Sequence, residues 1–117
     1  MNRRVVITGV GLLTPIGIGV KETWESLCAG KSGVGAITRF DVSNYQTKIA
    51  AEVKDFQAED FLPKKEAKRT ERFIAYAVAA ARMAIEDSGL VINGSNSDRV
   101  GVITGCGLGG LSILEDT

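Results

Sequence analysis

The sequence contains no histidine, only two cysteines and two prolines, and few aromatic residues (6%). The absence of histidine removes the usual general base for a serine or cysteine nucleophile and the commonest metal ligand. Cys28 and Cys106 lie far apart, without the dense spacing of a secreted disulfide scaffold or the paired spacing of a zinc site. We therefore expect no metal site and a reducing, cytoplasmic location.

Net charge and long apolar runs are also lacking. Fourteen Lys and Arg residues balance fourteen Asp and Glu residues, so no global field attracts nucleic acid or a membrane surface. Met1–Arg4 followed by the apolar stretch Val5–Val20 resembles a secretion signal, but Thr8, Thr14 and several glycines interrupt it. No stretch approaches the roughly 20 uninterrupted apolar residues of a membrane span.

What is present is an ordinary globular composition, with 44% hydrophobic and 24% charged residues in 117 positions. Apolar periodicity and glycine or polar boundaries predict strands and helices in alternation. The predicted elements are a strand at Val5–Ile7, a helix at Val20–Cys28, a strand at Lys48–Val53, a helix at Glu66–Ser88 and a strand at Arg99–Thr104. This order predicts a parallel or mixed α/β sheet with helices on its faces, as part of a larger layered domain.

The two helices have clear apolar patterns. Val20, Trp24, Leu27 and Cys28 recur at helical spacing, so we expect this stripe, including Cys28, to lie in the core. The centre of the second helix, Ala75–Ala81, is apolar nearly all round and is expected to be buried between layers. Gly30 and Gly89 are expected to end the two helices in a left-handed conformation.

Glycines between the last predicted strand and the following helix form a GxGxxG pattern at Gly105, Gly107 and Gly110, which is typical of dinucleotide-binding loops. The pattern alone is weak, and the earlier Gly9-x-Gly11 has Thr14 where a third glycine belongs. Cys106 lies in the later loop, but without a histidine to activate it we interpret it as a small structural residue.

Basic residues gather at the start of the second predicted helix. They are Lys64, Lys65, Lys68, Arg69 and Arg72, interrupted by Glu66 and Glu71. Cations are unfavourable at an electropositive helix N-terminus, which suggests a binding role. The alternative is an ordinary solvated, charged face.

Several blocks, in this order, resemble one known family. They are RRVVITGVGLLTPIG, TWESLCAGKSGVGAITRFD, KIAAEVKDF, KKEAKRTERFIAYAVAAARMAIEDSGL and RVGVITGCGLGGL. Together they resemble the elongating beta-ketoacyl synthases of dissociated bacterial fatty-acid synthesis, which act on substrates borne by acyl carrier protein. Ketosynthase domains of polyketide assembly lines share many of these blocks.

The resemblance implies a thiolase-like fold, layered αβαβα, in a homodimer that extends acyl chains by two carbons. Residues 1–117 would be the N-terminal part of the synthase domain and most of its first half, ending before the catalytic cysteine and the two assisting histidines. The chain alone is therefore expected to be inactive, with no catalytic residue of its own. No cofactor is implied beyond the phosphopantetheine of acyl carrier protein.

The resemblance also implies two substrate-related sites. Gly107 and Leu108 correspond to the acyl-pocket gate, where many relatives have isoleucine instead of leucine. Lys65, Lys68 and Arg69 correspond to residues that contact the acidic recognition helix of acyl carrier protein. Leu108 packing a turn without gating anything is the alternative for the first site.

Three classes of function remain open from the residues. The first is a condensing enzyme of fatty-acid elongation, with a polyketide ketosynthase as its near relative. The second is a nonenzymatic module that binds acyl carrier protein through the basic residues. The third is a nucleotide-binding oxidoreductase domain, which the incomplete glycine fingerprints disfavour.

Overall fold

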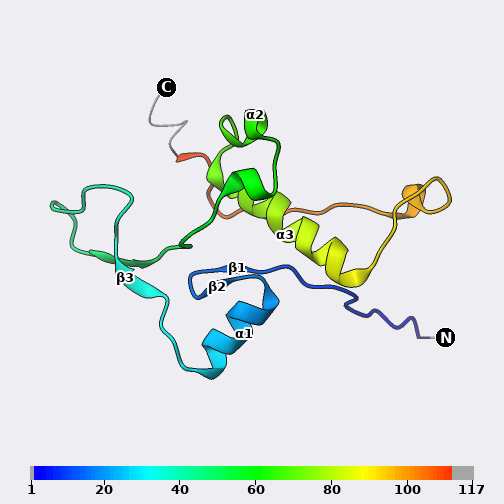
Figure 1. The fold of residues 1–117 in the computed structure, drawn as a ribbon, viewed down its shortest axis with the longest axis horizontal. Coiled ribbons are helices and arrows are strands. Elements are labelled where there is room, and N and C mark those ends of the chain that lie inside the picture. Colours follow the sequence, from blue (N-terminus) through cyan, green and yellow to red (C-terminus); the bar gives the residue numbers. More distant parts are fainter. Residues whose placement is uncertain (1, 112–117) are drawn as a thin grey trace.

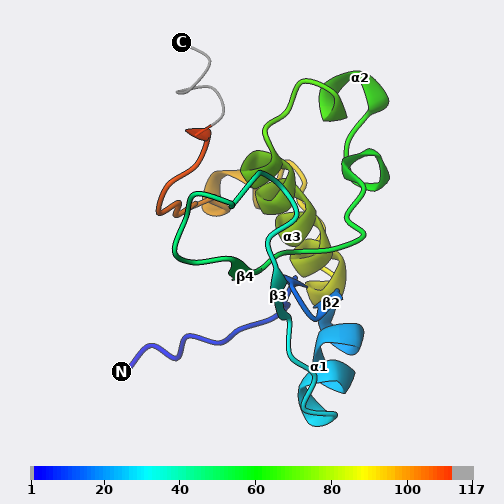
Figure 2. The same ribbon diagram turned by 90° about the vertical axis from the view of Figure 1, so that its left-hand side faces the viewer.

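The computed structural model describes residues 2–111, which form helices, short strands and long irregular segments. Figure 1 shows α3 in the middle, with α1 below it and α2 above, and Figure 2 confirms this order after a quarter turn. The helices are α1 (Val20–Cys28), α2 (Lys64–Ala67) and α3 (Arg72–Ser88), with short 3-10 turns η1 (Ala58–Asp60) and η2 (Ser97–Arg99). The helix predicted after the glycine loop lies mainly outside the described residues.

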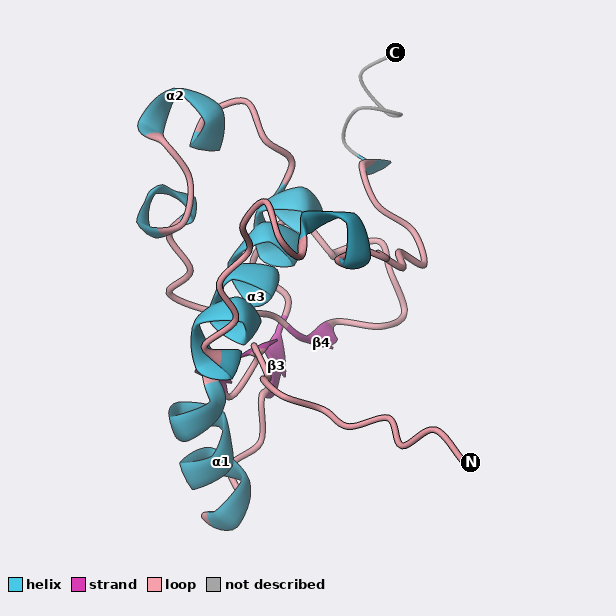
Figure 3. Ribbon diagram, turned by 90° about the vertical axis from the view of Figure 1, so that its right-hand side faces the viewer, coloured by secondary structure: helices cyan, strands magenta, loops and turns pink. Residues whose placement is uncertain are grey.

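Two small antiparallel sheets accompany the helices. The strands are β1 (Leu13–Thr14), β2 (Gly17–Ile18), β3 (Val34–Ala36) and β4 (Ile49–Ala51), paired β1 with β2 and β3 with β4. The registers place Leu13 opposite Ile18 and Gly35 opposite Ala50. Figure 3 shows how small these sheets are beside the loops that connect them. The strand predicted at Lys48–Val53 is confirmed in its central residues.

The predicted core strands at Val5–Ile7 and Arg99–Thr104 are wrong as paired strands within residues 2–111. Val5, Ile7 and Ile103 are 94%, 87% and 99% exposed, and no strand lies beside either segment. A β-branched run needs strand neighbours and covered faces to bury its side chains. These segments have the composition of central strands without the partners that would form a sheet around them.

The first helix has the predicted bounds, and Gly30 follows it with the expected left-handed φ of 64°. Its packing face was predicted wrongly, because Thr23 and Ser26 are buried whereas Trp24, Leu27 and Cys28 are exposed. The Thr23 hydroxyl donates to the Gly17 carbonyl (3.2 Å), which fixes the polar face of α1 against the β1–β2 hairpin. The apolar stripe is left facing outward.

The second predicted helix is divided in two. Lys68 ends α2, and Glu71 has an extended backbone (φ −56°, ψ 145°) before α3 begins at Arg72. The Thr70 hydroxyl donates to the Glu66 carbonyl (2.7 Å), a local side-chain bond that competes with the helical ladder. The predicted end of the helix is confirmed, because Gly89 is left-handed with φ 64°.

Packing around α3 is thin. Ala75 and Ala79 are buried, but Val78, Ala77 and Ala81 on the same helix are exposed, so burial of the whole apolar centre is not confirmed. On one side, Phe56 stacks on Phe61 (ring centroids 5.7 Å apart) and meets Tyr76 edge to face (4.8 Å). This aromatic cluster holds the segment before α2 against α3.

The β3–β4 hairpin is tied at its open end by side chains. Glu52 accepts hydrogen bonds from the Thr38 hydroxyl (2.7 Å) and the Thr38 backbone N–H (3.2 Å). The hydroxyl bond is the main cause of a lowered pKa for the Glu52 carboxyl. Arg39 donates to the Tyr76 hydroxyl (3.0 Å), which links this hairpin to α3.

Candidate functional site

An apolar hollow of about 690 Å³ brings together segments that are distant in the sequence. Its wall comes from the N-terminal segment, one face of α3 and the glycine loop. The lining residues are Gly11, Leu12, Leu13, Phe73, Ile74, Tyr76, Ala77, Val78, Ala80, Thr104, Gly105, Cys106 and Gly107. Such a mostly apolar, concave surface suits an acyl chain better than a charged ligand.

The glycine loop meets α3 at one position. A Cβ on Gly109 would lie 2.8 Å from the Phe73 ring, so a larger residue there would force the ring or the loop to move. Gly105 and Gly107 have no atom within 4 Å of such a Cβ. Of these three glycines, Gly109 is the one whose backbone closely approaches α3.

The predicted gate residues are placed differently from each other. Gly107 lines the apolar hollow, whereas Leu108 is 72% exposed and lies outside the lining. The loop is thus beside the apolar surface, with its largest side chain turned away from it.

Residues 64–72, which we call the basic segment, are exposed at all five of their cationic positions. Lys65 lies in α2, Lys68 ends it, and the Arg69 backbone N–H donates to the Glu66 carbonyl (2.9 Å). Within residues 2–111 these three side chains form no ion pair. Their charges are available to an acidic partner.

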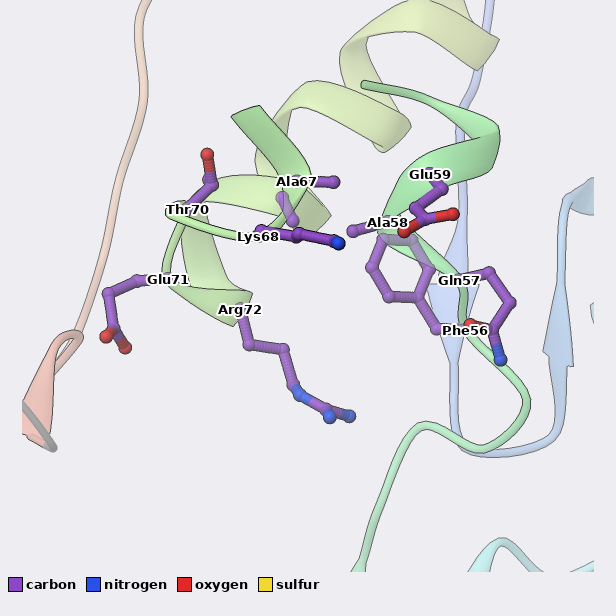
Figure 4. A pocket seen from close by; sticks show the side chains of 10 residues that line it. Phe56, Gln57, Ala58, Glu59, Ala67, Lys68, Thr70, Glu71 and Arg72 are labelled. Carbon is purple, nitrogen blue, oxygen red and sulfur yellow. The ribbon is translucent and has the colours of Figure 1, made fainter. Parts of the chain in front are cut away.

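A second hollow, of about 400 Å³, lies between η1 and the basic segment. Figure 4 shows Lys68 pointing across it towards Phe56 and Glu59, with Arg72 at its edge. Lys65 and Arg69 do not line it. The structure therefore separates the three predicted carrier contacts, with Lys68 over the hollow and the other two on the outer surface.

The chain matches the family described as "Beta-ketoacyl synthase, N-terminal domain" over residues 2–116. It belongs to the beta-ketoacyl synthase family. Among curated relatives, "3-oxoacyl-[acyl-carrier-protein] synthase 2" from Synechocystis sp. is 51% identical over 98% of this chain, and that from Coxiella burnetii is 51% identical over 97%. The protein of the same name from Staphylococcus aureus is 49% identical over 97%. The chain spans 28% of the length of each of these relatives.

A solved structure, "The ishigamide ketosynthase/chain length factor", is also similar, with a TM-score of 0.68 and 44% identity. The similarity covers 78% of this chain and 23% of that chain. The family and this likeness confirm the predicted thiolase-like α/β fold class.

Thiols are few in this synthase segment, and in its described part the potential metal ligands do not cluster. Cys28 and Cys106 are free, exposed thiols, and the whole sequence has no histidine. Across residues 2–111, no group of three or more His, Cys, Asp or Glu side chains could hold a metal ion. The helices described there include none long and apolar enough to cross a membrane.

Sequence reasoning missed the contact between the N-terminal glycines and α3. A Cβ on Gly9 would collide with the Ala84 carbonyl, and one on Gly11 would collide with the Ala80 carbonyl. The Val10 backbone N–H also donates to the Asp87 carboxylate (2.9 Å). The sequence feature that could have indicated this contact is the presence of small residues in both segments: glycines in the N-terminal segment and alanines in α3. Gly9-x-Gly11 thus allows close packing of the N-terminal segment against α3.

Proposed function

We propose that this chain is the N-terminal part of an enzyme that elongates acyl chains in fatty-acid biosynthesis. The supporting observation is its 49–51% identity, over 97–98% of the chain, to proteins named 3-oxoacyl-[acyl-carrier-protein] synthase 2. The reaction is a decarboxylative Claisen condensation of an acyl-enzyme with malonyl-acyl carrier protein. Malonyl loses carbon dioxide, the resulting carbanion attacks the acyl thioester, and the enzyme thiolate leaves.

The catalytic groups belong to other parts of the complete enzyme. A thiolate must hold the acyl group, and preorganised donors must stabilise the oxyanion, each donor commonly contributing about 3 to 4 kcal/mol. This chain has no histidine to supply such donors, and neither exposed cysteine has a histidine partner. Residues 1–117 therefore contribute binding surfaces to the reaction, and as an isolated chain they are inactive.

This chain contributes two binding sites, one for the acyl chain and one for acyl carrier protein. The apolar hollow beside Gly107 takes part of the acyl chain, and Leu108 gates the entry of longer chains. Lys65, Lys68 and Arg69 contact the acidic recognition helix of acyl carrier protein, whose phosphopantetheine carries both substrates. No metal or further organic cofactor takes part, and the complete enzyme is a cytoplasmic homodimer.

A polyketide ketosynthase is the second candidate. It is supported by the 44% identity and TM-score of 0.68 with the ishigamide ketosynthase/chain length factor. The two functions differ in the carrier protein and the acyl substrate that the complete enzyme prefers.

The test is a condensation assay with the full-length protein that carries this segment. Purified protein is mixed with acyl and malonyl derivatives of a fatty-acid carrier protein, and the 3-oxoacyl product is measured by mass spectrometry. Condensation on this carrier supports fatty-acid elongation. Condensation only on a polyketide carrier supports the second candidate. Carrier binding without condensation, by a native protein of about the mass of this chain, refutes both in favour of a nonenzymatic binding module.

A further inference from the structure

The ring of Phe73, in the first turn of α3, is the contact that fixes the glycine loop. Two ring carbons lie 2.8 Å from the position that a Cβ on Gly109 would occupy, and a third lies 3.7 Å from that of Gly110. Gly110 also has a left-handed φ of 74°, which favours glycine. The loop therefore seats its backbone directly on the ring.

Phe73 also forms part of the apolar hollow. It lines the same surface as Gly107 and Cys106, and its side chain is 38% exposed. Leu108 lies between Gly107, on the wall of the hollow, and Gly109, on the ring. The orientation of Leu108 is thus determined by a backbone anchored one residue away, because its own side chain has few neighbours.

The same turn of α3 borders both hollows. Arg72 and Ala75 line the hollow beneath the basic segment, whereas Phe73 and Ile74 line the apolar one. The basic segment ends at the residue before Phe73. A carrier bound at the first surface and an acyl chain at the second would contact opposite sides of one helical turn.

We infer that Phe73 is a positioning residue that determines acyl-chain length preference by anchoring the loop that carries Leu108. The inference rests on the proposed function. Phe73 does not act on the reacting atoms and is not a catalytic residue. Leu108 lies outside the hollow, next to Gly107 on its wall, so a long acyl chain that extends past Gly107 would meet it. Removal of the Phe73 ring frees the loop, lets Leu108 move aside and favours longer substrates.

The test compares variants of the full-length protein with hexanoyl and dodecanoyl carrier proteins. Phe73→Leu is expected to raise the ratio of kcat/KM for dodecanoyl over hexanoyl by roughly tenfold, the scale of a changed hydrophobic pocket. Gly109→Ala is the second variant, because its methyl group displaces the loop from the ring and should also change the ratio. In the double variant the two effects should not add, because the ring that the methyl group meets is gone.

Phe61→Leu is the matched control. Phe61 is a half-buried aromatic that stacks on Phe56 and does not line the apolar hollow. Its replacement should leave the ratio unchanged. Equal loss of rate with both substrates in Phe73→Leu, or an unchanged ratio in an active enzyme, overturns this inference alone. A parent protein that condenses neither substrate overturns the proposed function as well.

Discussion

Thr38 and Glu52 show how single side chains organise a part of the molecule that has almost no core. The Thr38 hydroxyl lowers the pKa of the Glu52 carboxyl because it donates a hydrogen bond to the charged form. A lowered folded-state pKa adds stability that is present above the unfolded pKa and is lost as the pH falls through the folded pKa. Acid should therefore loosen this end of the β3–β4 hairpin.

Replacing Thr38 with valine is expected to raise the Glu52 pKa towards its ordinary value, because the largest cause of the shift is removed. The pKa can be followed by NMR of a labelled glutamate carboxyl carbon, assigned with Glu52→Gln. Thr47→Val, in the loop between the two strands, is the control and should leave the Glu52 pKa unchanged. A Thr38→Val protein with the parental Glu52 pKa would contradict the assigned cause.

The positive charges of the basic segment are exposed to solvent. Lys65, Lys68 and Arg69 are exposed and form no ion pair within residues 2–111, so their charges act mainly through the field they present to a partner. Exposed charges of this kind increase association rates and make them sensitive to salt.

Reversing Lys65, Lys68 and Arg69 to glutamate in the full-length enzyme is expected to lower kcat/KM for carrier-bound substrates by roughly tenfold or more at low salt. The difference in kcat/KM between the variant and the parent should shrink at high salt, because salt screens the long-range attraction between the enzyme and the carrier protein. Steady-state rates at several salt concentrations provide the measurement. Reversal of the exposed Lys21, Lys31 and Lys48 is the charge-matched control. Equal effects of the two triple reversals would indicate that only net charge matters.

At the scale of elements, α3 and the N-terminal segment pack through small residues. Gly9 and Gly11 approach the backbone of α3 so closely that a methyl group has no room at either position. The Val10 N–H bond to the Asp87 carboxylate fixes the register between the segment and the helix. The contact thus depends on backbone proximity more than on large buried side chains.

Gly11→Ala is expected to destabilise the full-length protein by about 1 to 3 kcal/mol, the usual cost of overpacking. The midpoint of thermal unfolding is the measurement. Gly35→Ala is the control, because nothing lies within 4 Å of the added Cβ and the φ of Gly35 is not left-handed. An equal change in the two midpoints would show that the close approach of Gly11 to Ala80 does not matter for stability.

Local signals predicted the helices well and the strands poorly. Helix bounds at Val20–Cys28 and the stops at Gly30 and Gly89 follow from periodicity and from left-handed glycines, which are local properties. The break between α2 and α3 was not predicted, because the apolar periodicity continues across Thr70, where the hydroxyl bonds the Glu66 carbonyl. Strand Val5–Ile7 was predicted from composition, but a strand exists only with a partner, which no local pattern supplies.

For the candidate site, the sequence supplied residue names but not their arrangement, and the roles of these residues stay predictions. The resemblance indicated Gly107, Leu108 and the basic residues, and the structure places Gly107 on an apolar surface. The contact of Phe73 with the glycine loop was not predicted, because a phenylalanine on an apolar helix stripe cannot be distinguished by sequence from an ordinary core residue. Its special position depends on the distance to Gly109, which only the tertiary structure reveals.

For the whole molecule, the dimensions show how little is buried. The radius of gyration is 17.4 Å, whereas a compact domain of this length has about 13 Å. The accessible surface is 9758 Å², against about 6,100 Å² for a compact monomer of this mass. Ala75 and Ala79 are the buried apolar residues of the described part. So small a core cannot balance the conformational entropy of the chain.

A protein of residues 1–117 alone is therefore expected to unfold gradually in urea, without a cooperative transition, and to bind a hydrophobic dye. Circular dichroism and dye fluorescence measure the two properties. We expect neighbouring elements of the full-length protein to cover Val5–Ile7 and 101–103, so that protein should unfold cooperatively and bind little dye. A sharp transition of the 117-residue chain would show that these exposed runs find partners within it.

The most direct test of the account is condensation itself. The full-length protein that carries this segment, and residues 1–117 alone, are each incubated with acyl and malonyl carrier proteins, and 3-oxoacyl product is quantified. The account predicts product from the full-length protein and none from the isolated segment. Absence of product from a correctly folded full-length protein, or product formed by residues 1–117 alone, would contradict it.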